Sequence, residues 1–180
     1  MKLPTRKECI ALLKEHGNPE HIIAHSIATE KVCMHLGRKL KEQGIKINLQ
    51  LLSRAALLHD IAKFKTLHND VKHGIEGEKI LNELGFKEIA RITKNHGLGR
   101  IFVEGALQNW EDKLVYYADK RVTHDKVVSL DERFDYLRKR YGCISEEAMR
   151  TINAAYLPVK ELEKQIFNNA KCDISLKEMI

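Results

Sequence analysis

The spacing of apolar residues is the feature that most constrains how this chain folds. Apolar residues recur every three or four positions through most of the 180 residues, which is the period of an amphipathic helix. The two-residue alternation of a half-buried strand is hard to find. No internal repeat or low-complexity linker divides the chain, and its length suits one domain with a sizeable core. We therefore predict an all-α fold, as a single compact bundle over residues 1–180.

Capping and breaking residues divide this pattern into helices. Pro19 is expected in the first turn of the second helix, and Pro158 is expected to bend or split the last one. The third helix is expected to include residues 51–64, and the Gly-rich stretch 97–105 is expected to be a mobile loop. The residues that precede predicted helices, several of them within capping boxes, are Thr5, Asn18, Asn48, Asp70, Ser129 and Ser145.

Composition limits the classes of partner and compartment. The net charge of +6, with 31 Lys and Arg residues, favours anionic partners such as a phosphorylated small molecule. These basic residues are scattered rather than clustered, which disfavours nucleic acid as a partner. No apolar run is long enough to span a membrane, and the charged residues 1–7 do not form a signal peptide. Four separated cysteines without a CxxC pair favour a reducing cytoplasm and disfavour a zinc knuckle.

Six ionisable residues lie on the apolar faces of the predicted helices. His25, for example, shares a face with Ile22 and Val32, because residues three, four and seven apart align on a helix. A single buried histidine is more often hydrogen-bonded to the backbone than bound to a metal. Six such residues on five helices are better explained by a shared cation than by independent accidents. The six are His25, His59, Asp60, His73, His96 and Asp119.

The chemistry of this set indicates the kind of metal. Imidazole and carboxylate groups without a thiolate favour manganese, iron, cobalt or nickel over a structural zinc ion. His124-Asp125 is a second His-Asp dipeptide, but it follows the apolar face and is expected to be exposed. His68 lies in a loop, where it is either a mobile substrate contact or an ordinary loop histidine. The other histidines expected outside the site are His16, His21 and His35.

The order of the six residues resembles a known signature. His25, then His59-Asp60 in LLHDIAK and Asp119 in YYADKR, are similar to the H…HD…D pattern of the HD-domain metal-dependent phosphohydrolase superfamily. The resemblance extends from about residue 19 to residue 122. His73 in KHGIEGEKIL and His96 in KNHG match the extra histidines of members that bind two metals, including the symmetrical dinucleoside tetraphosphate hydrolases. No GYP sequence follows, so cyclic-di-GMP hydrolysis loses support.

The resemblance implies a fold, a metal centre and a reaction. It implies an HD-domain bundle with a core over residues 19–122, on which helices within residues 129–170 pack. His25, His59, Asp60 and Asp119 would hold one metal, and His73 and His96 would complete a second bridged by Asp60. Two iron or manganese ions per chain would activate water to cleave a phosphoester or phosphoanhydride of a nucleotide or dinucleotide.

Three basic residues are candidates for binding the substrate phosphate. Lys63 follows His59 by one turn and is either a phosphate ligand or, equally, a surface lysine at a helix end. Lys120 and Arg121 follow Asp119, and Arg121 is the better candidate because its planar fork binds phosphate with two hydrogen bonds. We expect Asp60, Lys63 and Arg121 to be catalytic.

Two other functions and the oligomeric state stay open. The same ligands holding two irons support oxygen chemistry in some relatives of this family, so a di-iron oxygenase is one alternative. A non-catalytic nucleotide-sensing module is the other, although every ligand position is filled. The chain is compatible with a homodimer.

Overall fold

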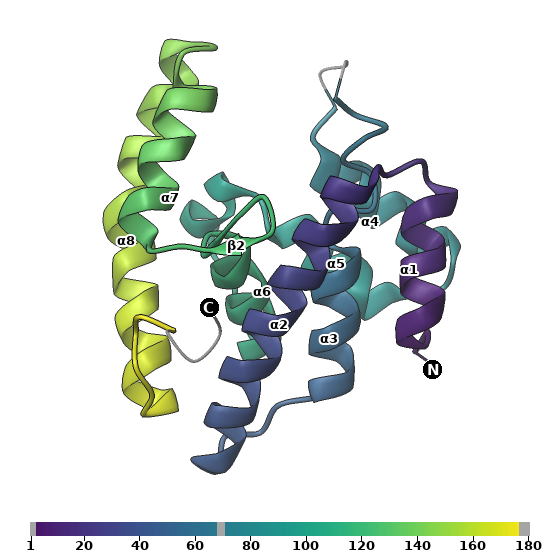
Figure 1. Cartoon of the computed structure of the whole chain (residues 1–180), viewed down its shortest axis with the longest axis horizontal. Coiled ribbons are helices and arrows are strands. Elements are labelled where there is room, and N and C mark those ends of the chain that lie inside the picture. The colour runs from purple at the N-terminus through teal and green to yellow at the C-terminus, as the bar shows by residue number, and fades with distance from the viewer. Residues whose placement is uncertain (1–2, 68–70, 177–180) are drawn as a thin grey trace.

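A computed structural model describes residues 3–67 and 71–176 (Figure 1). This part of the chain forms eight α-helices and one short hairpin, which confirms the predicted all-α fold. The helices are α1 (Arg6–Glu15), α2 (Glu20–Glu42), α3 (Leu49–Leu58), α4 (His73–Glu83), α5 (Lys87–Asn95), α6 (Trp110–Asp119), α7 (Leu130–Leu137) and α8 (Glu146–Ala170). The shorter elements are the 3-10 helix η1 (Leu98–Phe102), the strands β1 (Val122–Thr123) and β2 (Lys126–Val127), and the π-helical turn η2 (Arg138–Gly142).

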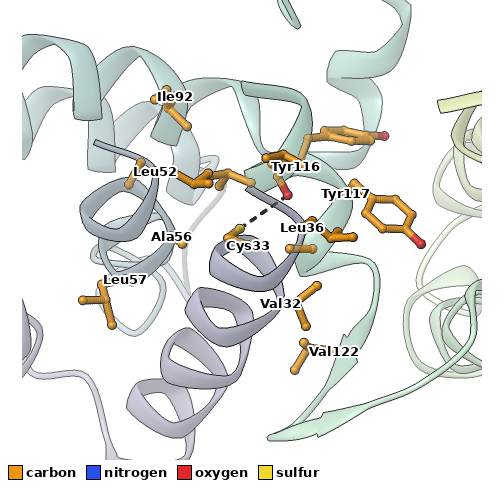
Figure 2. Close-up of a cluster of buried hydrophobic side chains, with 14 of the residues drawn as sticks. Val32, Cys33, Leu36, Leu52, Ala56, Leu57, Ile92, Tyr116, Tyr117 and Val122 are labelled. Atoms are coloured by element: carbon orange, nitrogen blue, oxygen red, sulfur yellow. Dashed lines mark hydrogen bonds between the residues drawn. The ribbon is translucent and has the colours of Figure 1, made fainter. Parts of the chain in front are cut away.

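The centre of the core lies where α2 packs against α3 and α6 (Figure 2). Val32, Cys33 and Leu36 of α2 are fully buried there, against Leu52 of α3. Gly37 lets the helices approach closely, since a Cβ at this position would lie 2.6 Å from a methyl group of Leu52. The periodic apolar residues of the sequence therefore form one contiguous core.

Helices α4 and α5 form an antiparallel pair next to α3. Their close packing depends on Gly77 of α4, because a Cβ there would lie 2.7 Å from Cγ2 of Thr93 on α5. This packing brings the beginning of α4 close to the end of α5. His73 begins α4 and His96 directly follows α5, so the two histidines come together.

The C-terminal helices lie along one side of the bundle, opposite α1 (Figure 1). Helix α8 packs against α2, α6, α7 and η1. It continues through Pro158 as a single helix, so the predicted splitting at this proline does not occur. None of the described helices is both long and apolar enough to cross a membrane.

Asn18 differs from its predicted role as a helix cap. Pro19 is the N-cap of α2, and α2 begins at Glu20. The Asn18 side chain instead donates hydrogen bonds to the carbonyl oxygens of Leu13 and Ile61, at 3.1 and 2.7 Å. Two backbone carbonyls, one of them 43 residues away, therefore replace the capping interaction that the sequence predicted.

Three further segments differ from the sequence predictions. Helix α3 ends at Leu58, and residues 59–67 form a series of turns in place of the predicted helix through residue 64. The Gly-rich stretch 97–105 contains η1 rather than being wholly irregular. The hairpin of β1 and β2 was not predicted at all. His68 and Asp70 lie outside the described residues.

Candidate metal centre

All six predicted metal ligands come together, and five of them lie at the ends of helices. His59 and Asp60 directly follow α3, and Asp119 is the last residue of α6. His73 and His96 come from the beginning of α4 and the end of α5, as described above. His25 alone lies away from a helix end, on the buried face of α2. Helix ends place these side chains around one point without interrupting the packed core.

Four of the six residues form one group of facing ligand atoms. Nε2 of His25 lies 3.0 Å from Oδ1 of Asp119 and 3.8 Å from Oδ2 of Asp60. Nε2 of His59 lies 3.4 Å from Oδ2 of Asp60 and 3.6 Å from Oδ1 of Asp119. Within this group, ligand atoms of His25, His59 and Asp60 all lie within 4.8 Å of one another, a spacing that one metal ion can span.

A second group shares Asp60 with the first. Nε2 of His73 and Nε2 of His96 lie 3.4 and 3.5 Å from Oδ1 of Asp60. The two imidazole nitrogens are 2.8 Å apart. Asp60 therefore turns Oδ2 toward the first group and Oδ1 toward the second, which is the arrangement of a bridging carboxylate.

Backbone carbonyls set the orientation of three of the imidazole rings. Nδ1 of His25 contacts the carbonyl oxygen of His124 at 2.9 Å, and Nδ1 of His59 contacts that of Ala56 at 2.7 Å. Nδ1 of His96 contacts the carbonyl oxygen of Thr93 at 2.5 Å. Because a carbonyl can only accept, Nδ1 of each ring carries the proton. When the ring is neutral, the lone pair on its Nε2 therefore points into the centre, as metal-binding histidines require.

Unsatisfied buried atoms show that these residues fit divalent cations. Nε2 of His59 and Oδ1 of Asp60 are buried and have no hydrogen-bond partner. Leaving such an atom unpaired costs roughly 1–3 kcal/mol. The facing nitrogens of His73 and His96 also repel when each carries a lone pair. A cation in each group would remove both costs, because it accepts these lone pairs as ligands.

Electrostatics keep both carboxylates ionised. Burial alone would raise the pKa of Asp60, but Lys63 and His59 hold it well below its usual range. Burial alone would also raise the pKa of Asp119. Lys120 and His25 outweigh burial and hold this pKa well below its usual range. Ionised carboxylates are the form that binds a metal.

The histidines of the two groups differ in their pKa. Burial lowers the pKa of His59, but the two carboxylates outweigh burial and raise it to about 9. The pKa of His73 is lowered to about 4, mainly by burial and by the nearby His96. Burial also lowers the pKa of His96. The second group is therefore set up as neutral imidazoles, whereas His59 must release a proton when a cation binds.

The two predicted phosphate-binding lysines lie at the site but hold its carboxylates. Nζ of Lys63 contacts Oδ2 of Asp60 at 2.6 Å. Nζ of Lys120 contacts Oδ2 of Asp119 at 2.9 Å and donates a second hydrogen bond to the carbonyl oxygen of His96. Both lysines line a cavity of about 300 Å³ that opens onto Asp60, Asp119 and the second group. They therefore orient metal ligands at the edge of the space available to a substrate.

Arg121 does not reach the centre, which corrects its predicted role. Its Nε donates to the carbonyl oxygen of Val128 at 2.6 Å, and its Nη1 donates to the Tyr117 hydroxyl at 2.5 Å. The same nitrogen lies 3.4 Å from Oε1 of the buried Glu163 and 3.0 Å from the carbonyl oxygen of Ile174. Arg121 thus connects α6 to α8 and the C-terminal segment, and it is not among the residues that line the cavity.

Sequence reasoning missed Arg133, an arginine of α7 that lines the cavity. Its Nη2 lies 3.9 Å from Oδ1 of Asp119. The spacing of Leu130, Arg133, Phe134 and Leu137 places Arg133 on the apolar face of α7, and this pattern was the available signal. The carbonyl of His124 was missed for another reason, since no residue type marks a backbone acceptor. The side chains of His16, His21, His35 and His124 take no part in either ligand group.

Comparison with known proteins gives a family and several relatives. Residues 22–123 match the family described as the HD domain. An uncharacterised protein of Methanocaldococcus jannaschii is 30% identical over 135 residues, covering 68% of this chain and 79% of the relative. No solved structure matches the chain.

Two longer relatives are named tRNA (cytidine(56)-2'-O)-methyltransferase. The protein from Picrophilus torridus is 26% identical and covers 91% of this chain, and the one from Thermoplasma volcanium is 24% identical and covers 77%. This chain spans only 47% and 42% of their respective lengths.

The matched residues 22–123 contain the whole candidate centre. All six ligand positions of the signature are filled, and their geometry suits divalent metals. The chain therefore belongs to the HD domain family, within the metal-dependent phosphohydrolase superfamily that its residue pattern resembles.

Proposed function

We propose that this chain is a metal-dependent phosphohydrolase that cleaves a phosphoester or phosphoanhydride of a nucleotide or dinucleotide. The observation that carries the proposal is the position of Asp60. Its two oxygens face separate groups of ligand atoms, and the cavity beside it is lined by cations. Paired metal sites bridged in this way suit displacement at phosphorus.

Each residue of the centre has a role in this proposal. His25, His59, Asp60 and Asp119 would hold one divalent metal, and Asp60, His73 and His96 a second. When bound, such a metal pair supplies a nucleophile from water at neutral pH and neutralises charge on the phosphoryl oxygens. Lys63 and Lys120 hold the carboxylates in position, and the backbone carbonyls behind the histidines hold the rings.

The cavity supports a phosphorylated small molecule as the substrate. Its volume of about 300 Å³ is at the lower end of the usual range for small-molecule sites, which is roughly 300–1,000 Å³. Lys63, Lys120 and Arg133 give it cationic walls, and an anionic group is attracted to such a site. These cations favour phosphate chemistry over a di-iron oxygenase, and the complete ligand set disfavours a non-catalytic sensor.

The test is a metal analysis followed by a phosphate-release screen. Protein purified without chelator should contain iron or manganese, and metal-loaded protein should release phosphate from one or more mononucleotides or dinucleoside polyphosphates. Chelation should abolish release, and adding back manganese or ferrous iron should restore it. Full metal occupancy without phosphate release, together with oxygen consumption on an organic substrate, would place the protein in the oxidative class.

A phosphoester of RNA is a second candidate substrate. Two relatives that cover 91% and 77% of this chain are named as tRNA methyltransferases, and this chain carries a net charge of +6. The scattered distribution of its basic residues favours the small-molecule substrate instead. The same screen distinguishes the two when it includes transfer RNA and short RNA ending in a 2',3'-cyclic phosphate. Preference for these over every mononucleotide would establish the RNA alternative.

A further inference from the structure

Arg133 is held in the wall of the metal cavity by the packing of α7. Its neighbours on the same face, Leu130 and Phe134, are buried at 1% and 0% exposure and anchor the helix to the core. Arg133 itself is only 9% exposed. The rigid attachment of α7 therefore fixes the guanidinium beside Asp119, where it lines the cavity.

The guanidinium of Arg133 has no hydrogen-bond partner among the described residues. Its Nε is buried and unpaired, and Nη2 lies 3.9 Å from Asp119, too far for a hydrogen bond. Its other described contact is with the ring of Tyr136, 5.5 Å away. Arg121 is similarly buried but donates to several oxygens. A buried guanidinium with unused donors favours an anion supplied from outside the chain.

The cavity offers this anion a position beside Arg133. Nζ of Lys63 and Nζ of Lys120 are already bonded to Asp60 and Asp119, at 2.6 and 2.9 Å. Of the described cations that line the cavity, Arg133 alone makes no hydrogen bond to a protein group. An anion bound to Arg133 would lie against Asp119 and the metal ligands beyond it. A phosphoryl group has the charge and the oxygen atoms to occupy this position.

An apolar wall continues from Arg133 along the same segment. Leu137 ends α7 and Tyr141 lies in η2, and both line the cavity. Leu67 and Leu98 line it as well. Tyr141 is 41% exposed, so its ring is accessible to a planar group. Aromatic rings of this kind stack on nucleobases irrespective of sequence.

We propose that Arg133 binds two oxygens of the substrate phosphate and that Tyr141 packs against the nucleoside attached to it. This inference rests on the proposed phosphohydrolase function and adds the residues that recognise the substrate. Both lie beyond residues 22–123, the part that matches the HD domain. The segment from α7 to η2 is thus the part of this chain that selects its substrate.

The first test measures binding of inorganic phosphate to manganese-loaded protein by calorimetry. Arg133→Gln should weaken phosphate binding by about tenfold or more, since hydrogen bonds to charged groups contribute about that factor. Arg138→Gln is the matched control, because Arg138 pairs with Asp135 and Asn153 and does not line the cavity. Arg133→Lys should bind phosphate with intermediate affinity, because a lysine keeps the charge but not the fork.

The second test measures the nucleoside contribution. A non-hydrolysable phosphonate analogue of adenosine monophosphate should bind wild-type protein more tightly than inorganic phosphate does. Tyr141→Ala should remove most of that difference and leave phosphate binding unchanged. Arg133→Gln should weaken the binding of both ligands by a similar factor.

Metal content and melting temperature must match the wild type for these comparisons to count. If the glutamine variant fails to fold, phosphate binding by Arg133→Lys is measured in its place. Undiminished phosphate binding in Arg133→Gln would overturn the inference, as would the absence of phosphate binding by metal-loaded wild-type protein. Phosphate binding through Arg133 without hydrolysis of any substrate would contradict the proposed function alone.

Discussion

Residues 22–123 and the C-terminal segment from α7 to α8 contribute to the same cavity in different ways. The first region supplies all six candidate metal ligands, and its backbone carbonyls hold the rings of His59 and His96. The second supplies Arg133 and the apolar wall with Tyr141. The residues of the first set face one another as candidate ligands of a shared cation, whereas the guanidinium of Arg133 has no hydrogen-bond partner among the described residues. This difference indicates that the candidate metal centre and the proposed substrate-recognition surface are separable parts.

The largest effect is expected from a change at Asp60, which joins the two ligand groups. Asp60→Asn keeps the shape of the side chain but removes the negative charge that both metals would share. We expect metal content to fall from about two ions per chain to below one, and turnover to fall to background. Elemental analysis and phosphate release measure the two losses. Wild-type metal content with full activity would contradict both the bridging arrangement and the proposed function.

A double change at the second group should separate the two metals. Replacing His73 and His96 by alanine removes the ligands that face Oδ1 of Asp60 and leaves the first group complete. We expect at most one metal per chain and a severe loss of turnover. The control is the exposed His21→Ala, which should keep its full metal content. Two metals retained in the double variant would show that the second group is not a metal site.

A change at Arg121 should affect the stability of the protein without affecting the candidate metal centre. Arg121→Met removes the cation at Oε1 of the buried Glu163 and leaves Lys160, 3.5 Å from Oε2, as its remaining cationic contact. Breaking a buried pair costs up to roughly 3–5 kcal/mol of unfolding free energy. We expect this loss in urea denaturation, with metal content unchanged. Arg150→Gln on the exposed face of α8 is the control and should change stability by no more than about 0.5 kcal/mol. Unchanged stability with a large loss of turnover would restore Arg121 to the catalytic role predicted from the sequence.

A smaller effect is expected at the contact between α4 and α5. Gly77→Ala places a methyl group 2.7 Å from Thr93, and overpacking of this kind costs about 1–3 kcal/mol. Because the same contact brings His73 to His96, metal binding at the second group should weaken more than at the first. Gly99→Ala is the control, since nothing lies within 4 Å of its added Cβ. Equal weakening of both metals would show that α4 and α5 do not set the second group.

The smallest effect is expected at the second His-Asp dipeptide. His124 is exposed, has a positive φ of 57°, and contributes its carbonyl rather than its ring to His25. His124→Gly keeps that carbonyl and suits the backbone conformation, so we expect metal content and turnover close to wild type. Titration with manganese measures the affinity. A clear loss of metal would show that the imidazole of His124 takes part in the centre.

The sequence was sufficient to predict which ionisable side chains gather at the candidate centre, because helix periodicity identifies which side chains face inward. His25, for example, lies on the buried face of α2 as its spacing indicated. Periodicity does not identify which residues of other helices an inward side chain contacts. Arg121 and Arg133 are both buried, but the packing of α8 and α7 decides that one meets Glu163 and the other the cavity.

Predictions from local sequence patterns were also wrong where contacts between distant residues determine the backbone conformation. Helix α3 ends at Leu58 although the apolar pattern continues, and the carbonyl of Ile61 is bonded to the side chain of Asn18 instead. The same contact takes Asn18 away from its predicted capping role. Partners 43 residues apart leave no mark in a local pattern, so neither feature could be predicted from the sequence.

The turns after α3 have a consequence for how the protein opens. His59 and Asp60 lie outside the regular hydrogen bonding of α3, and Asn18 holds the turn that follows them through Ile61. The backbone hydrogen bonds of residues 59–67 are separate turn bonds rather than a continuous helical series. Segments of this kind exchange their amide hydrogens through local opening rather than global unfolding. Residues 59–67 should therefore form an exchange unit of their own in metal-free protein. Metal binding should slow amide exchange in residues 59–67 more than in α2. The exchange rates of these residues would therefore measure how fully the candidate centre is occupied by metal.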